Sequence, residues 1–387
     1  MSSITTIRDK SGRAIKYRAR YRTPDGASRS QTFNKKAAAE AFLNSTEHRK
    51  LNDEYVDTSA GRITFGAYAR DWAERQPHRA TTSESIEAIL RRHILPTFEA
   101  RPISSIRTSE VQAWVVSLGT PTHNEEGEIV KSALSPTTIA LVYGKLAGIM
   151  RSAVDDQRIV RTPCTRGVKL PRQDGAEVVL MSPEQVVAIA DAVPARYRAL
   201  VVLIAGTGAR PGEALGLTVD RVDWLRRRIR IDRQLITVAK SVPTFGPTKT
   251  ASSVRTVAAP QVVLDELSQH IAHHGAGPGG LIFTDTKGDP IRRNALGHVW
   301  RRAAAEAGVE AYSWHDLRHY AASVMIHQGA SVKAVQRQLG HASATTTLDV
   351  YAHLWPDAED TTRAALDAGL TRFVSSSCHD VSHRQAN

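Results

Sequence analysis

The chain has 387 residues, 41% of them hydrophobic and 23% charged, so it is long enough for two or three domains with ordinary apolar cores. Lys and Arg number 51 against 39 Asp and Glu, and this net charge of +12 favours a polyanionic partner, either nucleic acid or an anionic membrane surface. The longest apolar run has seven residues, too short to cross a bilayer, and two cysteines provide neither a disulfide framework nor a cysteine-built zinc site. We also expect no signal peptide, so these features exclude secreted, membrane and zinc-finger proteins and predict a cytoplasmic, basic, multidomain protein.

The first fifty residues carry twelve basic and four acidic side chains, a net charge of +8. Apolar and cationic residues alternate over Ile15–Arg22, which is the period of a strand with one apolar and one cationic face. With strands at Ile4–Arg8 and Ser28–Phe33, this segment predicts a three-stranded antiparallel sheet whose apolar face is covered by a helix over Lys35–Lys50. The cations of the other face are Lys16, Arg18, Arg20 and Arg22. Such a face can simply be solvated, but four cations in a row are better explained by a phosphate backbone or a DNA major groove.

The middle of the chain predicts a small all-helical domain between two linkers, near residues 51–63 and 161–175. The expected helices are Phe65–Gln76, Ser83–Leu95, Thr108–Leu118 and Pro136–Gln157. A polar loop over Gly119–Ser132 has room for a short hairpin.

Helical signals resume after Leu180, where Ser182 and Pro183 form a helix start. Further helices are expected at Arg196–Ala205, Pro211–Leu217, Pro260–His273, Arg292–Ala307, Trp314–Gln328, Val332–Leu339, Ala344–Tyr351 and Asp357–Leu370. The expected strands are Arg228–Asp232, Leu235–Val238 and Val254–Ala258. The polar tail after residue 372 predicts disorder.

Five short polar motifs interrupt the apolar helical sequence of the second half. They are TGARPGE at 207–213, PTFGPTKT at 243–250, WHDLRH at 314–319, LGH at 339–341 and DVYAH at 349–353. We expect Arg210 at a glycine-flanked turn, Lys249 in the turn of a β-hairpin, and His315 one helical turn from Arg318 on the same face.

Three kinds of site compete for these residues. A nucleotide site is disfavoured because the glycines at 206, 208 and 212 have the wrong spacing for a phosphate-binding fingerprint. A metal site at His315 and His319 lacks both the glutamate of the zinc-protease motif and a third ligand. Phosphoryl transfer fits best, because two arginines, a lysine and two histidines around one nucleophile suit the negative charge of its transition state.

The second half also resembles the tyrosine recombinase, or phage integrase, family. The strings TGARPGEALGL, PTKTASSVRTV, WHDLRHYAASVMIHQG and LGHASATTTLDVYAH occur in the family's order and spacing. The resemblance implies a mainly α protein with small β-sheets. Its expected parts are an arm-type DNA-binding domain at 1–55, a helical core-binding domain at 62–165, an α/β catalytic domain at 178–372 and a disordered tail at 373–387.

Carried over by motif, the family's roles make Tyr351 the nucleophile that attacks a DNA phosphodiester and forms a 3′-phosphotyrosine. His315 is then the base, and Lys249 protonates the departing 5′-oxygen. Glu213, one turn into the helix after Arg210, supports the site without contacting the phosphate itself. The remaining residues, Arg210, Arg318 and His341, bind the phosphate oxygens. No metal, ATP or other cofactor is implied, because the protein's own cations supply the charge and the phosphotyrosine conserves the bond energy. His319, His327 and His353 are expected to be structural or peripheral.

The resemblance implies a site-specific recombinase, the integrase of a phage or integrative element, acting as a homotetramer on two synapsed DNA duplexes. Its arm-like N-terminal sheet favours core and arm attachment sites and allows an accessory DNA-bending or directionality factor. Two alternatives remain open. A type IB topoisomerase relaxes supercoiled DNA without recombinant products, and an inactive DNA-binding relative behaves identically when Tyr351 is replaced by Phe.

Overall fold

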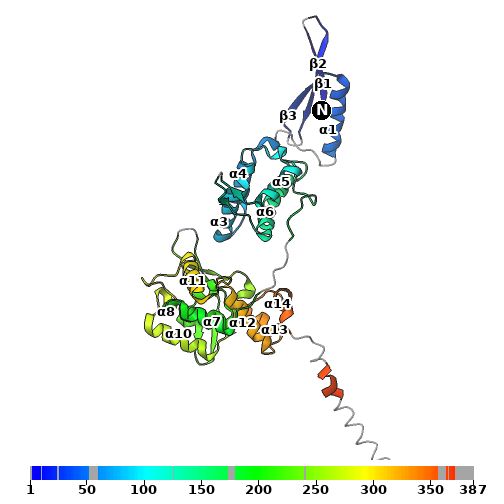
Figure 1. The fold of residues 1–387 in the computed structure, drawn as a ribbon. Coiled ribbons are helices and arrows are strands. Elements are labelled where there is room, and N and C mark those ends of the chain that lie inside the picture. The colour runs from blue at the N-terminus through cyan, green and yellow to red at the C-terminus, as the bar shows by residue number, and fades with distance from the viewer. Residues whose placement is uncertain are drawn as a thin grey trace, which may run out of the picture. The chain divides into compact units, whose positions relative to one another are not determined.

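The computed structural model describes residues 2–9, 11–23, 26–51, 60–124, 126–172, 179–238, 241–355, 363–364 and 366–370. The chain forms two compact units, Met1–Gly175 and Ala176–Asn387 (Figure 1). The expected tail at 373–387 lies outside the described residues, and of the helix expected at 357–370 only residues 363–364 and 366–370 are described, as helix.

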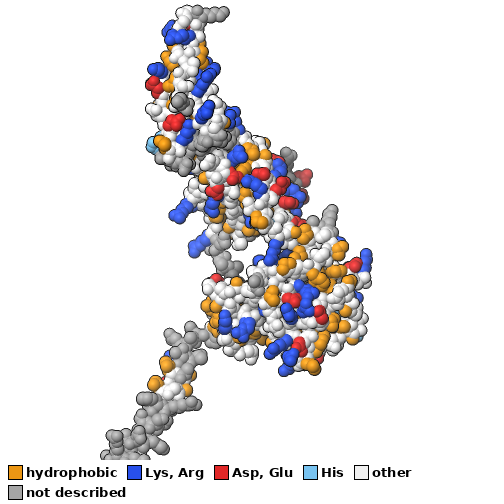
Figure 2. Space-filling model, turned by 180° about the vertical axis from the view of Figure 1, so that it is seen from behind, with side chains coloured by type: hydrophobic (Ala, Val, Ile, Leu, Met, Phe, Trp, Pro, Cys, Tyr) orange, Lys and Arg blue, Asp and Glu red, His pale blue; other side chains and the backbone are white. Residues whose placement is uncertain are grey.

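The N-terminal part is the expected three-stranded antiparallel sheet with one helix. Its strands β1 (Ser3–Arg8), β2 (Ala14–Arg22) and β3 (Ser28–Phe33) pair in chain order, and α1 (Lys36–Leu51) follows them. Ala19 and Tyr21 of β2 are buried against Ala39 and Leu43 of α1, which confirms the apolar face. Arg18, Arg20 and Arg22 alternate with them on β2, point the other way and are exposed, and Lys and Arg side chains are numerous on this part of the surface (Figure 2).

The rest of the first unit is helical. It consists of α2 (Phe65–Arg75), α3 (Ala80–Ile89), α4 (Leu95–Phe98), α5 (Thr108–Leu118) and α6 (Pro136–Asp155), with a hairpin of β4 (Thr122–His123) and β5 (Ile129–Lys131). Its core contains the edge-to-face pair of Phe98 and Trp114 and the buried Leu146.

One expected helix of this unit, Ser83–Leu95, is wrong in its bounds. The chain becomes helical already at Ala80, and a π-helical turn over Leu90–Ile94 separates α3 from α4. Pro96 explains the interruption, because it has no N–H to donate and its ring disfavours regular helix in the preceding turn.

The second unit is built around a buried helix. Its helices are α7 (Pro183–Ala192), α8 (Ala195–Thr207), α9 (Pro211–Leu215), α10 (Gln261–His274), α11 (Arg293–Ala307), α12 (Asp316–His327), α13 (Val332–Leu339) and α14 (Ala344–Tyr351). From Ala199 onward, apolar residues occupy all sides of α8, as expected of a helix enclosed by others, and α7, α10 and α12 pack against it. A smaller apolar cluster beside this core encloses Tyr351 at the end of α14.

Two small sheets complete the second unit. Strands β6 (Val222–Asp223), β7 (Arg228–Ile231) and β10 (Arg255–Ala258) form one sheet, in the order β10-β7-β6, and β8 (Arg233–Ile236) pairs with β9 (Thr244–Pro247) in a hairpin. Lys249 does not lie in a hairpin turn, so that expectation is wrong. Ile236 pairs with Thr244, so the two strands of this hairpin are joined before Thr244, and Lys249 follows in the connection from β9 to β10.

Candidate active site

Arg210 is positioned by the turn between α8 and α9. Gly208 ends α8 at φ +69°, a left-handed conformation that favours glycine, and a Cβ atom there would also come within 2.5 Å of the Leu339 side chain. Arg210 is the N-cap residue of α9, and Pro211 occupies the first helical position. Its guanidinium donates to Glu213 Oε1 at 2.7 Å and to Ser253 Oγ at 3.3 Å, which holds the group at the edge of the site.

Glu213 is a buried carboxylate between two arginines. Its Oε2 accepts hydrogen bonds from the guanidinium of Arg255 at 2.9 Å and from the backbone N–H of Arg210 at 3.0 Å. Burial alone would raise the pKa of Glu213, but the charges and hydrogen bonds of Arg255 and Arg210 outweigh burial and lower it. Glu213 therefore stays ionised and fixes both arginines.

Arg255 connects the strand after Lys249 to the helix before His341. It is 9% exposed, and its guanidinium donates to the carbonyls of Gln338 at 2.8 Å and Ser253 at 3.0 Å. Arg255 was not among the residues that the sequence motifs predicted for the site. The sequence could have indicated it, because Arg255 and Val257 are two residues apart in β10 and therefore lie on the same, buried face of the strand.

Arg318 of α12 is almost fully buried, at 2% exposure, beneath these groups. Its guanidinium donates to the backbone carbonyls of Gly208 at 2.6 Å and Leu339 at 2.8 Å, and thus joins the ends of α8 and α13. Burial and the charges of Arg210 and Arg255 lower the pKa of Arg318 to about 9, so it keeps its positive charge at neutral pH. Arg318 is thus a buried cation that two backbone carbonyls hold in place.

His341 follows Gly340, the left-handed residue that ends α13. Its Nδ1 lies 2.9 Å from the hydroxyl of Thr347 on α14. Burial, together with the charges of Arg318 and Arg210, lowers the pKa of His341 to about 4, so the ring is neutral at pH 7. A hollow of about 220 Å³ beside His341 is lined by Ser252, Val254, Arg255, Lys333, Gln336, Arg337, Gly340 and His341, without a carboxylate.

The hydroxyl of Tyr351 contacts a histidine, but not the one expected. Tyr351 OH lies 2.7 Å from Nδ1 of His319, and the two ring centroids are 5.6 Å apart. His315, the expected base, is exposed at the start of α12 and makes an edge-to-face contact with His319 at 5.1 Å. Although the residue is exposed as a whole, partial burial of its imidazole and the charges of His319 and Arg318 lower the pKa of His315 to about 4. His319 is therefore not peripheral, and its signal in the sequence was its i, i+4 spacing from His315.

Lys249 is exposed, and none of the described residues pairs with its ammonium group. The backbone beside it is nevertheless fixed, because Thr250 Oγ1 lies 2.9 Å from Ser253 Oγ, which in turn accepts from Arg210. The residue that follows Lys249 is thus connected through Ser253 to Arg210, and the lysine itself is exposed to solvent.

The second unit therefore gathers most of the expected residues into one site. Direct contacts join Arg210 to Glu213, and Tyr351 through His319 to His315. Arg318 lies close enough to Arg210, Glu213 and Tyr351 to interact with them electrostatically, and His341 does so with Arg318 and Arg210. The four N-terminal cations, Lys16, Arg18, Arg20 and Arg22, are exposed on β2 and belong to the first unit.

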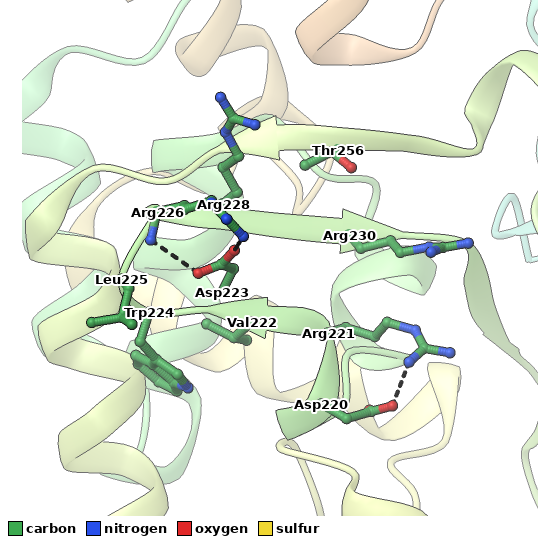
Figure 3. Close-up of a pocket in the computed structure, with 10 residues that line it drawn as sticks. All are labelled: Asp220, Arg221, Val222, Asp223, Trp224, Leu225, Arg226, Arg228, Arg230 and Thr256. Atoms are coloured by element: carbon green, nitrogen blue, oxygen red, sulfur yellow. Dashed lines mark hydrogen bonds and ion pairs between the residues drawn. The ribbon is translucent and has the colours of Figure 1, made fainter.

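A second hollow, of about 670 Å³, lies on the sheet β10-β7-β6, and none of the expected site residues lines it. Figure 3 shows its lining, in which Arg226 pairs with Asp223 and Arg221 with Asp220. In the part of the chain that the structure describes, no three His, Cys, Asp or Glu residues are grouped to hold a metal. Among the same residues, no helix is both long enough and apolar enough to cross a membrane.

Comparison with known proteins places this site in a family. Residues 180–357 match the model of the phage integrase family. The integrase of Mycobacterium phage D29 is 25% identical over 354 residues, which cover 88% of this chain and 90% of the phage protein. Tyrosine recombinase XerD of Corynebacterium glutamicum is 29% identical over 266 residues, 66% of this chain and 81% of XerD. The matched region therefore belongs to the phage integrase family of site-specific tyrosine recombinases, enzymes that break and rejoin DNA.

Solved structures share the fold. The Tn1549 transposon integrase, in complex with a circular intermediate DNA, superposes with a TM-score of 0.65 at 22% identity over 78% of this chain and 97% of its own. A lambda integrase dimer bound to a COC′ core site gives a TM-score of 0.55 at 16% identity, over 91% of this chain and 96% of that one. Both confirm the expected mainly helical architecture with small sheets.

Proposed function

We propose that this chain integrates and excises a phage or integrative element by cleaving DNA through Tyr351. The observation that carries this proposal is that Arg318 interacts electrostatically with Arg210, with His341 and with the buried Tyr351. Such a cluster of fixed donors suits a phosphoryl group whose negative charge grows in the transition state.

Each side chain then has a defined task. The phenol of Tyr351 passes its proton to His315, and its oxygen attacks the phosphorus of the scissile phosphodiester. Arg210 and Arg318 neutralise the non-bridging oxygens, and neutral His341 donates a hydrogen bond to them. As the bond to the 5′-oxygen breaks, Lys249 supplies the proton that makes a 5′-hydroxyl, and the DNA remains attached as a 3′-phosphotyrosine. A 5′-hydroxyl from another strand reverses these steps without ATP or a metal ion.

The surroundings of the site support a DNA substrate. Lys333 and Arg337, one helical turn apart on α13, line the hollow beside His341 together with Arg255. A cation-lined hollow free of carboxylates, next to the proposed scissile phosphate, suits a further phosphate of the same strand.

The remaining parts of the chain complete the proposal. The sheet domain at 1–55 binds arm sites through Lys16, Arg18, Arg20 and Arg22. The helical domain at 62–165 and the catalytic domain at 178–372 bind the core site. Four copies of the chain assemble on two synapsed duplexes in the cytoplasm. An accessory bending or directionality factor selects integration or excision. This assignment is supported by the exposed cationic face of β2 and by relatives named as phage integrases.

The test places the gene with its native flanking DNA on a non-replicating plasmid, beside a Tyr351→Phe control, and sequences plasmid–chromosome junctions in a host. We expect one recurrent junction with the wild type and none with the variant, and the junction identifies the attachment site. On that DNA, the purified wild type forms a covalent adduct that survives denaturing gels. An adduct that persists with Tyr351→Phe refutes the assignment of the nucleophile, and relaxation of supercoiled DNA without junctions favours a topoisomerase.

A further inference from the structure

The proposed nucleophile is enclosed by protein in this structure. Tyr351 is 1% exposed and packs in the small apolar cluster with Ala322, Ile326 and Leu339. A phosphate in a DNA duplex is too bulky to reach an enclosed hydroxyl, so attack requires Tyr351 to move outward from this position.

Three aromatic rings in contact lead from the buried Tyr351 toward the surface. Tyr351 contacts His319, which is half-buried, and His319 contacts His315, which is exposed. Because the two histidines are four residues apart, they lie on one face of the helix, with His319 as the inner ring and His315 as the outer ring.

We propose that His319 is a positioning residue that holds Tyr351 in a resting position, from which the tyrosine moves toward His315 when DNA is bound. This inference rests on the proposed function and assigns the two histidines different tasks. His319 keeps the nucleophile in the core, and His315 takes its proton at the phosphate.

The protonation states define this hydrogen bond. Burial raises the pKa of Tyr351 to about 12, so its hydroxyl keeps its proton and donates. Burial lowers the pKa of His319, an effect that Arg318 reinforces and Asp316 opposes, so the ring is neutral, and in the tautomer that carries its proton on Nε2 the Nδ1 atom accepts. The 2.7 Å contact is therefore a neutral O–H to nitrogen hydrogen bond in a protected place.

Removal of the hydrogen-bond acceptor on His319 should increase the rate of cleavage. In His319→Ala the buried hydroxyl loses its partner, and an unsatisfied buried hydroxyl destabilises the position that contains it. We therefore expect the first cleavage of a nicked attachment-site DNA to become faster, by roughly fivefold or more. His319→Asn is the matched control, because its side-chain oxygen takes the place of Nδ1, and we expect it to cleave at close to the wild-type rate.

The experiment measures single-turnover adduct formation by the full chain, with DNA affinity and thermal unfolding measured in parallel. Faster cleavage by His319→Ala, restored to the wild-type rate in His319→Asn, supports the proposal. Equal or slower cleavage by a folded, DNA-bound His319→Ala overturns it. If both variants cleave slowly, His319 takes part in the chemistry itself and the proposal is equally wrong.

Two further measurements keep the test decisive. His319→Phe retains a ring in the packing and removes only the acceptor, so it replaces the alanine variant if that variant unfolds. In the free protein labelled with 3-fluorotyrosine, the fluorine resonance missing from Tyr351→Phe identifies Tyr351, and we expect greater solvent exposure of it in His319→Ala. Unchanged exposure contradicts the proposal. Loss of the adduct in Tyr351→Phe shows separately that the proposed function holds.

Discussion

The two groups of cations in this chain are held in opposite ways. On β2, residues such as Arg18 and Arg20 project from one face of a sheet into solvent. In the second unit, Arg255 and Arg318 are buried, and their guanidinium groups donate hydrogen bonds to carboxylate or carbonyl oxygens. Exposed cations bind a polyanion with little geometric demand and are screened by salt, whereas fixed cations stabilise one arrangement of charge at one place. The first arrangement suits binding, and the second suits catalysis.

The largest effect expected from this comparison is on the rate of cleavage. Arg318→Ala removes a fixed cation from the site, and we expect cleavage of bound DNA to slow by about 10²–10³-fold, as when one preorganised donor is removed from an active site. Arg18→Ala is the contrast, and its bound complex should cleave at the wild-type rate. Single-turnover assays at saturating protein measure both, and equal reductions in the two variants contradict the comparison.

The next effect is on stability. Glu213→Ala leaves Arg255 buried without its carboxylate, and we expect the free energy of unfolding at pH 7 to fall by about 3–5 kcal/mol. Because folding lowers the pKa of Glu213, its contribution is present above the unfolded-state pKa and disappears as the pH falls through the folded-state pKa. The difference between variant and wild type should therefore shrink in acid. Urea unfolding measures it.

The matched control for this prediction is an exposed ion pair. Lys36 and Glu40 lie 3.4 Å apart on α1, both largely in solvent. Glu40→Ala should change the free energy of unfolding by less than about 1 kcal/mol at any of these pH values. A decrease as large as that of Glu213→Ala would mean that burial does not distinguish the two pairs.

Local sequence patterns predicted much of this molecule. The strand Ser28–Phe33 and the helices Thr108–Leu118 and Val332–Leu339 have the predicted bounds, because alternation, capping and helical period act over a few residues. The π-helical turn before Pro96 was missed, because periodicity continues through it although the hydrogen-bond register changes.

The contacts within the site were harder to predict than its members. Motif order singled out Tyr351 and His315, but no local pattern shows that the tyrosine hydroxyl rests on His319, since that depends on how α14 packs against α12. Arg255 was missed for a related reason, because its partners Glu213 and Gln338 are distant in the sequence. The residue roles themselves stay predictions until variants are measured.

The smallest effect expected concerns the exposed cations. Replacing Arg18 and Arg20 by Ala should weaken arm-site binding and reduce the slope of log affinity against log salt by roughly one unit for each phosphate that the variant no longer neutralises. Lys36→Ala is the control, because α1 packs on the apolar face of the sheet, opposite these arginines, and this substitution should leave the slope nearly unchanged. Titrations of arm-site DNA at several salt concentrations measure the slope. If the double variant keeps the wild-type slope, the face is only solvated, and arm-site binding must depend on other residues.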